Sequence, residues 1–381
     1  MAKLFSSLIR LLFLGFLVVF VFFHNKLNVA FDYPYHDFID NIYVRLAKIS
    51  LLLLLVIELM RVFYYGVIKN DKSPKWLTNI ATLVLPLIAL LIFLEIGFMF
   101  ISQSHEGGLT LASHVWFERY WKPITADGYR DQEHTDTLGK KKILVVGDSF
   151  TAGHGLKEEE ERYSNVLEKK LGSQNYVVYN LGISGSDTRD EYKRLTQYKV
   201  KPDILVVQYF PNDIEKAAKD NGLVPAVSRP YSDVPGFLRI LFVNSYLLNF
   251  IYWQLPHTSE APFSDYALKA YTTPAIINSH LRDLEQFVTY ANENKIPLYV
   301  VMFPFSHNLE KTAQYTRPVI AFFRQHNVPV LEVGTLIKNI DPDDRIVGRN
   351  DFHASAMVNQ RVGEALYRMV STNQMVATRK K

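Results

Sequence analysis

The sequence predicts an α/β domain with a three-layer, doubly wound parallel sheet, preceded by an N-terminal membrane region of three helices. Two observations lead to this prediction. Long apolar runs crowd the first hundred residues, and from Lys141 onward short apolar runs alternate with stretches of helical period. We expect a membrane anchor at 1–101, a linker at 102–140 and the α/β domain at 141–375, with an insertion at about 215–275.

Three apolar runs suit membrane helices, which need about 20 apolar residues each. They are Leu8–Phe23, Leu46–Val67 and Ile80–Ile101. The first could instead be a signal peptide, but no small-residue cleavage site follows Phe23. Lys and Arg gather near the N-terminus and between the second and third runs, which predicts that both regions are cytoplasmic. Three spans then place the α/β domain outside the cytoplasm, either periplasmic or extracellular.

Composition excludes several classes of function. The net charge is only +4, and no dense Lys/Arg block accompanies a nucleic-acid motif, so we expect no binding of DNA or RNA. Three spans with sparse internal charge are too few for a transporter. The chain has no cysteine, so the predicted compartment depends on topology alone.

The α/β pattern is read from mostly apolar strand-length runs and from the helical stretches between them. The predicted strands are Ile143–Val146, Tyr176–Leu181, Ile204–Tyr209, Pro297–Phe303 and Val328–Val333. The predicted helices are Glu158–Leu171, Asp187–Val200, Ile276–Asn294, Glu310–His326 and Ala354–Val370.

Polar motifs lie where ligands bind in such sheets, beyond the carboxyl ends of the strands. Gly147–Thr151 follows the first strand, Asn180–Gly185 ends the second, Phe210–Asp213 follows the third, and Asn350–His353 precedes the last helix. We expect these four segments to meet at one edge of the sheet.

Residue types in the four segments suit acyl chemistry. A serine hydroxyl needs a base to take its proton, and the oxyanion that forms needs hydrogen-bond donors. Ser149 could be the nucleophile, His353 the base, and Asp351 the group that holds the imidazole tautomer. The backbone of Ser149, the backbone of Gly185 and the side chain of Asn212 could supply the oxyanion donors.

Together, Gly-Asp-Ser after a first strand, a glycine after a second, Asn-Asp after a third and a late Asp/His pair resemble the GDSL or SGNH hydrolases. The resemblance covers about residues 125–372 and implies a flavodoxin-like SGNH fold and a serine acyl-enzyme. It implies Ser149, Asp351 and His353 as catalytic residues and Gly185 and Asn212 as oxyanion donors, with Gly182 as the alternative glycine.

Two positions depart from the family pattern. Phe210 stands where the third block usually has glycine, and Asp351 precedes His353 by two positions rather than three. The shorter spacing is similar to that of membrane-linked bacterial members, including acetyltransferase-like domains that act on envelope polysaccharides.

Other polar residues receive structural interpretations. Asp148 and Asp213 are expected to brace their turns through backbone hydrogen bonds. Asp341–Asp344 is interpreted as a turn without metal. His154 and His307 are interpreted as surface histidines, with contact to the substrate as the alternative. The apolar segment Phe237–Trp253 could pack against the sheet or form a helical cap over the active site.

The sequence therefore predicts a membrane-anchored serine esterase or acylhydrolase that needs no cofactor and no metal. Its substrate would be an acylated small molecule, lipid or polysaccharide, and its partners would be the membrane and components of an envelope complex. Two alternatives remain open: an O-acyltransferase that modifies envelope polysaccharide, and a non-catalytic carbohydrate-binding assembly subunit.

Overall fold

The computed structural model describes residues 2–22, 42–68, 79, 85–224, 231, 234–255 and 261–378. The chain divides into two compact units. The anchor unit comprises Met1–Gln103, Gly108–Arg119 and Arg229–Pro256, and the sheet unit comprises Ser104–Gly107, Tyr120–Ser228 and His257–Lys381. The units are therefore interleaved along the chain, and part of the predicted linker and of the predicted insertion falls in each of them.

The sheet unit is built on five parallel strands in the order β2-β1-β3-β4-β5. This is the flavodoxin-like order, in which the chain changes direction between β1 and β3. The strands are β1 (Lys141–Gly147), β2 (Tyr176–Gly182), β3 (Ile204–Tyr209), β4 (Leu298–Met302) and β5 (Val330–Glu332). All five predicted strands are thus present, with small shifts at their ends, and the predicted fold class of the sheet is confirmed.

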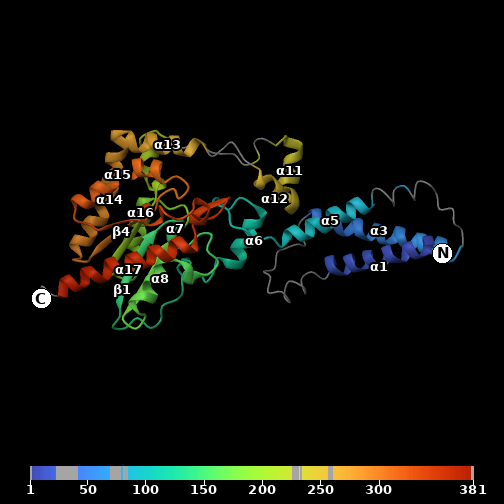
Figure 1. Cartoon of the computed structure of the whole chain (residues 1–381), viewed down its shortest axis with the longest axis horizontal. Coiled ribbons are helices and arrows are strands. Elements are labelled where there is room, and N and C mark those ends of the chain that lie inside the picture. The colour runs from blue at the N-terminus through green and yellow to red at the C-terminus, as the bar shows by residue number, and fades with distance from the viewer. Residues whose placement is uncertain are drawn as a thin grey trace. The chain divides into compact units, whose positions relative to one another are not determined.

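Helices cover both faces of this sheet (Figure 1). The predicted helices correspond to α8 (Tyr163–Leu171), α9 (Thr188–Gln197), α14 (Pro274–Glu293), α15 (Leu309–Gln325) and α17 (Ala356–Thr378). Shorter helical elements are α7 (Ser149–Ala152), η2 (Glu159–Glu161), η3 (Pro211–Ile214), α10 (Glu215–Asp220), α13 (Ala261–Thr272), α16 (Val333–Ile337) and η5 (Pro342–Arg345).

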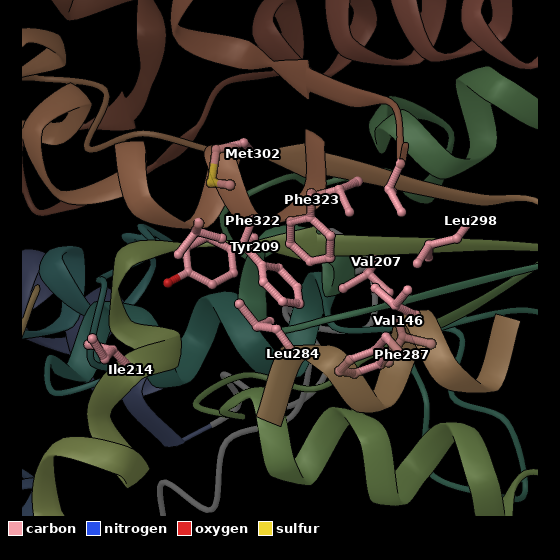
Figure 2. Packing of buried hydrophobic residues seen from close by; sticks show 14 of the residues in the cluster. Val146, Val207, Tyr209, Ile214, Leu284, Phe287, Leu298, Met302, Phe322 and Phe323 are labelled. Atoms are coloured by element: carbon pink, nitrogen blue, oxygen red, sulfur yellow. The ribbon is translucent and has the colours of Figure 1, made fainter. Parts of the chain in front are cut away.

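Successive residues of a strand face opposite sides of a sheet, so each strand contributes to two cores. Leu144 and Val146 of β1 pack in one core with α14 and α15. Ile143 and Val145 pack in the other core with α8 and α17. Figure 2 shows the first core, where strand side chains meet the aromatic rings of the two helices. Each fully buried aliphatic side chain contributes about 1.5–3 kcal/mol.

A short antiparallel hairpin, absent from the sequence prediction, precedes the last helix. It pairs β6 (Ile346–Gly348) with β7 (Asp351–Ala354). The predicted helix start at Ala354 falls on the last residue of β7, and α17 begins at Ala356. Strands this short have too few residues for an alternating pattern to be recognised.

The anchor unit contains three apolar helices, α1 (Ala2–Phe22), α3 (Ile42–Gly66) and α5 (Leu85–Met99). A shared apolar cluster includes Leu17, Leu51 and Ile92. Glu58 of α3 is buried but paired, since its carboxylate lies 2.8 Å from Arg10 and 3.4 Å from Arg61. Pairing is what permits charged side chains among apolar helices.

The expected membrane region of three helices requires a correction. Among the described residues, two helices are long and apolar enough to cross a membrane, Lys3–Phe20 and Lys48–Gly66. The third run forms α5, whose apolar part Leu87–Met99 is shorter than a bilayer-spanning helix, while 80–84 lie outside the described residues.

The apolar segment of the insertion forms α11 (Gly236–Asn244) and α12 (Tyr246–Gln254) in the anchor unit, which also holds nearly all of α6 (Leu111–Tyr120). Phe250 of α12 meets Phe98 of α5 edge to face, with ring centroids 5.0 Å apart. The segment therefore belongs to the anchor unit, where α12 packs on α5.

Candidate active site

The first motif forms a tight turn at the carboxyl end of β1, beside the point where the sheet order reverses. Asp148 caps α7 by accepting a 2.9 Å hydrogen bond from the Phe150 N–H, so Ser149 is the first residue of that helix. A Cβ on Gly147 would lie 2.2 Å from Thr151 Oγ1, so only glycine fits there. The turn therefore fixes the position of the serine hydroxyl.

The hairpin missed by the sequence analysis brings the late Asp/His pair to this serine. His353 Nε2 lies 2.7 Å from Ser149 Oγ, and His353 Nδ1 lies 2.5 Å from Asp351 Oδ1. An ionised carboxylate only accepts hydrogen bonds, so Nδ1 carries the proton and Nε2 is left to accept from the serine hydroxyl. All three residues are buried.

The two-residue spacing of Asp351 and His353 follows from strand geometry. Both belong to β7, and residues two apart in a strand project from the same face. Asn350, at the three-residue spacing, has its carbonyl oxygen 2.9 Å from the Glu106 N–H. The departure from the family spacing therefore leaves the acid within hydrogen-bond distance of the base.

The electrostatics of the pair suit a base oriented by a carboxylate. Burial by itself would raise the pKa of Asp351, but the hydrogen bond and charge of His353 outweigh it and lower that pKa to about 2. Burial by itself would lower the pKa of His353, but the hydrogen bond and charge of Asp351 outweigh it and raise that pKa above 6.5. Asp351 is thus ionised and favours the imidazolium that forms when His353 takes a proton.

The three predicted oxyanion donors come from three strand ends. Ser149 begins α7, Gly185 lies in the loop after β2, and Asn212 lies in η3 after β3. The backbone N–H groups of Ser149 and Gly185 have no hydrogen-bond acceptor in the described part of the chain. Both are therefore available to a ligand. Asn212 also lies within reach of Asp148, and its two amide hydrogens can serve both partners.

The alternative glycine, Gly182, has a structural task. Its N–H donates to Asn180 Oδ1 at 3.0 Å, and a Cβ there would lie 2.2 Å from the Ala152 nitrogen. Gly185 instead has φ +76° and open space around it. These contacts favour Gly185 as the oxyanion donor.

The expected bracing by two buried aspartates is confirmed. Asp148 accepts from the Phe150 N–H, and Asp213 accepts from the Phe210 N–H at 2.8 Å. Burial raises the pKa of both carboxyl groups, and Asp148 adds to the shift at Asp213 by repulsion. Phe210, which replaces the usual glycine, packs on Phe150 with ring centroids 4.5 Å apart and the two rings tilted by 33°.

The interpretation of His154 as a surface residue is wrong, whereas His307 is exposed. The His154 ring is 3% exposed and stacks on His353 with centroids 4.3 Å apart and an interplanar angle of 11°. Its Nε2 lies 3.0 Å from the His105 carbonyl oxygen. Burial and the neighbouring His353 charge lower the pKa of His154 to about 4, so it is neutral and forms one wall of the site.

Arg130 binds the backbone that follows the serine turn. The sequence predicted no role for it. Its buried guanidinium donates to the carbonyl oxygens of Gly153 and Leu156, the latter at 2.8 Å. The adjacent Asp131 accepts from the Asn180 N–H at 2.9 Å and pairs with Arg162 at 3.2 Å. The only sequence signal was a charged turn, Asp127–Asp131, without a recognisable motif.

Within the described residues, one group places three possible metal-ligating side chains close together. These are His154, Asp351 and His353, whose ligand atoms lie within 4.8 Å of one another. The Asp351–His353 hydrogen bond and the bond from His154 to the His105 carbonyl already engage this group.

The GDSL-like Lipase/Acylhydrolase family matches residues 145–361, more than half of the chain. The chain belongs to this family. The matched residues include the serine turn and the Asp351/His353 hairpin. The resemblance inferred from the four motifs is therefore confirmed. As a family member, the protein is a serine hydrolase of the SGNH/GDSL type that acts on ester bonds.

Solved structures similar to this family member share low identity with it. A lipolytic protein of the G-D-S-L family from Desulfitobacterium hafniense DCB-2 is 15% identical, with a TM-score of 0.38, covering 60% of this chain and 99% of that one. A catalytic mutant of an acetylxylan esterase from Geobacillus stearothermophilus is 16% identical, with a TM-score of 0.38, covering 61% of this chain and 95% of that one. A lipase/acylhydrolase from Enterococcus faecalis is 16% identical, with a TM-score of 0.37, covering 61% and 96%. No curated protein matches the sequence.

Proposed function

We propose that this family member is a membrane-anchored esterase that works through an acyl-enzyme on Ser149. The observation that carries the proposal is the continuous contact from Ser149 Oγ to His353 Nε2 at 2.7 Å and from His353 Nδ1 to Asp351 Oδ1 at 2.5 Å. These two distances and the opposite pKa directions of Asp351 and His353 support Ser149 as nucleophile, His353 as base and Asp351 as the group that orients the base.

In the first half-reaction, Ser149 Oγ attacks the ester carbonyl carbon while His353 Nε2 takes the hydroxyl proton. The negative charge moves to the carbonyl oxygen, where the N–H groups of Ser149 and Gly185 and the Asn212 amide stabilise it. The tetrahedral species then collapses, the alcohol leaves with the proton from His353, and the acyl group remains on Ser149. Asp351 stays ionised throughout and stabilises the imidazolium.

In the second half-reaction, His353 deprotonates an acceptor hydroxyl, which attacks the acyl-enzyme and releases Ser149. Water as acceptor makes an esterase, and a sugar hydroxyl makes an O-acyltransferase, the alternative function. The apolar helices near the N-terminus support the O-acyltransferase alternative, because an enzyme bound to the membrane has both lipid and envelope polysaccharide within reach. Incubation of an acylated donor with and without a soluble glycan separates the two, since only a transferase forms an acylated glycan.

The proposed anchor consists of α1 and α3, the two helices of the described residues that are long and apolar enough to cross a membrane. An outer location of the sheet unit depends on a third crossing, because two crossings return the chain to the side of the N-terminus, which the Lys and Arg distribution assigns to the cytoplasm. Leu138 is 96% exposed, so a Leu138→Cys variant can report this side. Its modification in intact cells by a membrane-impermeant maleimide supports an outer location, and modification only after lysis contradicts it.

The esterase proposal is tested by labelling the full-length protein in membranes with a fluorophosphonate probe and by measuring hydrolysis of a nitrophenyl acetate. We expect Ser149→Ala to abolish both signals and His353→Ala to reduce both strongly. Ser173→Ala, on an exposed turn, is the matched control and keeps both. Equal labelling and hydrolysis in Ser149→Ala would overturn the mechanism, whereas the absence of both signals in the native protein would favour the non-catalytic carbohydrate-binding subunit.

A further inference from the structure

The helical pair α11 and α12 has an apolar outer surface that the esterase mechanism does not use. Inward-facing Leu238 and Phe242 of α11 pack against a cluster formed by Tyr231, Val234 and Tyr252. The opposite arc of the same helix is also apolar. Its exposed apolar residues are Phe237, Ile240, Leu241 and Val243.

The exposed apolar residues of α11 are spaced so that they form one continuous surface. Residues three and four apart share a helix face, so Phe237, Ile240 and Leu241 form one patch. Phe237 is 80% exposed, and α11 has no buried residue at all. A helix this short and this apolar is unfavourable in water, because folding leaves most of its apolar surface solvated. Arg239, also exposed, lies at the edge of the arc.

The pair is held at one end of an apolar anchor helix. Glu95 of α5 accepts hydrogen bonds from Ser245 Oγ at 2.7 Å, from the Tyr246 N–H at 2.5 Å and from the Leu247 N–H at 3.1 Å. A carboxylate at a helix N-terminus satisfies backbone donors and complements the helix dipole. Glu95 lies near the C-terminal end of α5, whose apolar sequence continues after it to Met99.

The contact between Glu95 and α12 bears on how deeply α11 and α12 lie relative to the bilayer. A carboxylate and free backbone donors are costly in hydrocarbon, so in the proposed anchor Glu95 and the polar N-terminus of α12 lie at the polar boundary of the bilayer. The helix joined to that point is then at the level of the lipid headgroups. The same unit exposes apolar side chains on its candidate spanning helices, such as Phe16 of α1 and Phe63 of α3, as lipid-facing helices do.

We propose that α11 is an interfacial helix that docks the Phe237, Ile240 and Leu241 face into the membrane surface, with Arg239 among the phospholipid headgroups. Such helices bury an apolar face about 5–10 Å into the headgroup and acyl boundary, and basic residues at the edge favour anionic lipid. The occupant of the patch is the lipid bilayer. The inference rests on the proposed membrane anchor, and it assigns the insertion a second contact with the membrane.

The absence of cysteine makes the test direct, because each introduced cysteine is the only one in the chain. Full-length Phe237→Cys and Leu241→Cys are labelled with an environment-sensitive nitrobenzoxadiazole dye. They are reconstituted in vesicles of phosphatidylcholine with a minority of phosphatidylglycerol. Leu138→Cys is the aqueous control, and Phe16→Cys on α1 reports the anchor itself. Labelling by the fluorophosphonate probe confirms that each variant is folded.

We expect blue-shifted emission at Phe237 and Leu241, with strong quenching by lipids that carry a nitroxide near the headgroup and weaker quenching by deep nitroxides. Leu138 should show neither effect. If Phe16 is quenched while Phe237 and Leu241 behave like Leu138, the interfacial helix is refuted and the anchor stands. If Phe16 is not quenched either, the anchor has failed. A blue shift without lipid quenching means that protein covers the patch, which also overturns the inference.

Discussion

Replacing Asp351 with asparagine removes a buried charge from beside His353 and keeps the side-chain shape. The pKa of Asp351 falls from 3.8 to about 2 in the folded chain, because His353 outweighs the effect of burial. At about 1.4 kcal/mol for each pKa unit, this corresponds to about 2 kcal/mol of folding stability. The pKa is lowered on folding, so that stability is present above pH 3.8 and is lost as the pH falls towards 2.

The same substitution is expected to change catalysis more than stability. An asparagine can donate its amide N–H to an unprotonated Nδ1, which stabilises the wrong tautomer of His353. It also supplies no charge to the imidazolium, so we expect kcat to fall roughly 10³- to 10⁴-fold. The base works when neutral, so kcat/KM of the native enzyme should fall as the pH drops through the raised pKa of His353, above 6.5. In the variant, burial still lowers that pKa and Asp351 no longer raises it, so the midpoint should move to lower pH.

The assay is hydrolysis of a nitrophenyl ester across pH, with denaturant unfolding of the detergent-solubilised protein at neutral pH. Asp343→Asn is the matched control, because Asp343 is an exposed aspartate of η5 with the same change in charge. We expect it to leave the pH midpoint, kcat and unfolding free energy unchanged. A midpoint in Asp351→Asn equal to that of the native enzyme, or a loss of activity under tenfold, would refute the reasoning.

Three further substitutions test the scaffold and the oxyanion site. Gly182→Ala should prevent folding or lower the free energy of unfolding by several kcal/mol, because its Cβ would lie 2.2 Å from the Ala152 nitrogen. The control Gly348→Ala should be tolerated, since its Cβ would meet nothing within 4 Å. Equal unfolding midpoints for the two variants would contradict this prediction. Arg130→Met should lower the unfolding free energy by at least about 2 kcal/mol, because buried carbonyl oxygens lose their donor, and an unchanged midpoint in a denaturant titration would contradict it. Asn212→Ala should lower kcat by roughly 10²- to 10³-fold with little change in KM, and a loss confined to KM would exclude an oxyanion role.

Much of the sheet unit could be predicted from the sequence, because its strands are continuous apolar runs separated by helical stretches. All five strands were placed within a few residues, and the first three carry a polar motif at their carboxyl ends. The parallel arrangement then implies that Ser149, Gly185 and Asn212 approach one another, since carboxyl ends of parallel strands share one edge. These predictions depend only on local periodicity and on a general rule of topology.

The number of spanning helices and the surroundings of His154 were predicted less well. Composition alone gave three spans, but helix length depends on where each helix starts and ends, and α5 is too short over its described residues. His154 follows two residues after a buried helix turn, and nothing local distinguishes it from a solvated histidine. Its burial comes from Ser104–Gly107, a segment more than forty residues earlier that supplies the His105 carbonyl oxygen.

The sequence by itself thus determined the family, the parallel sheet and the identity of the candidate nucleophile, base and acid, because these are carried by short motifs and local patterns. Only the tertiary structure decided that Asp351 can reach His353 at a two-residue spacing, since that depends on a hairpin too short to leave a pattern. It also decided that the helices of the insertion belong with the anchor. Contacts such as that of Glu95 with the start of α12 join residues about 150 positions apart, and no local pattern records them.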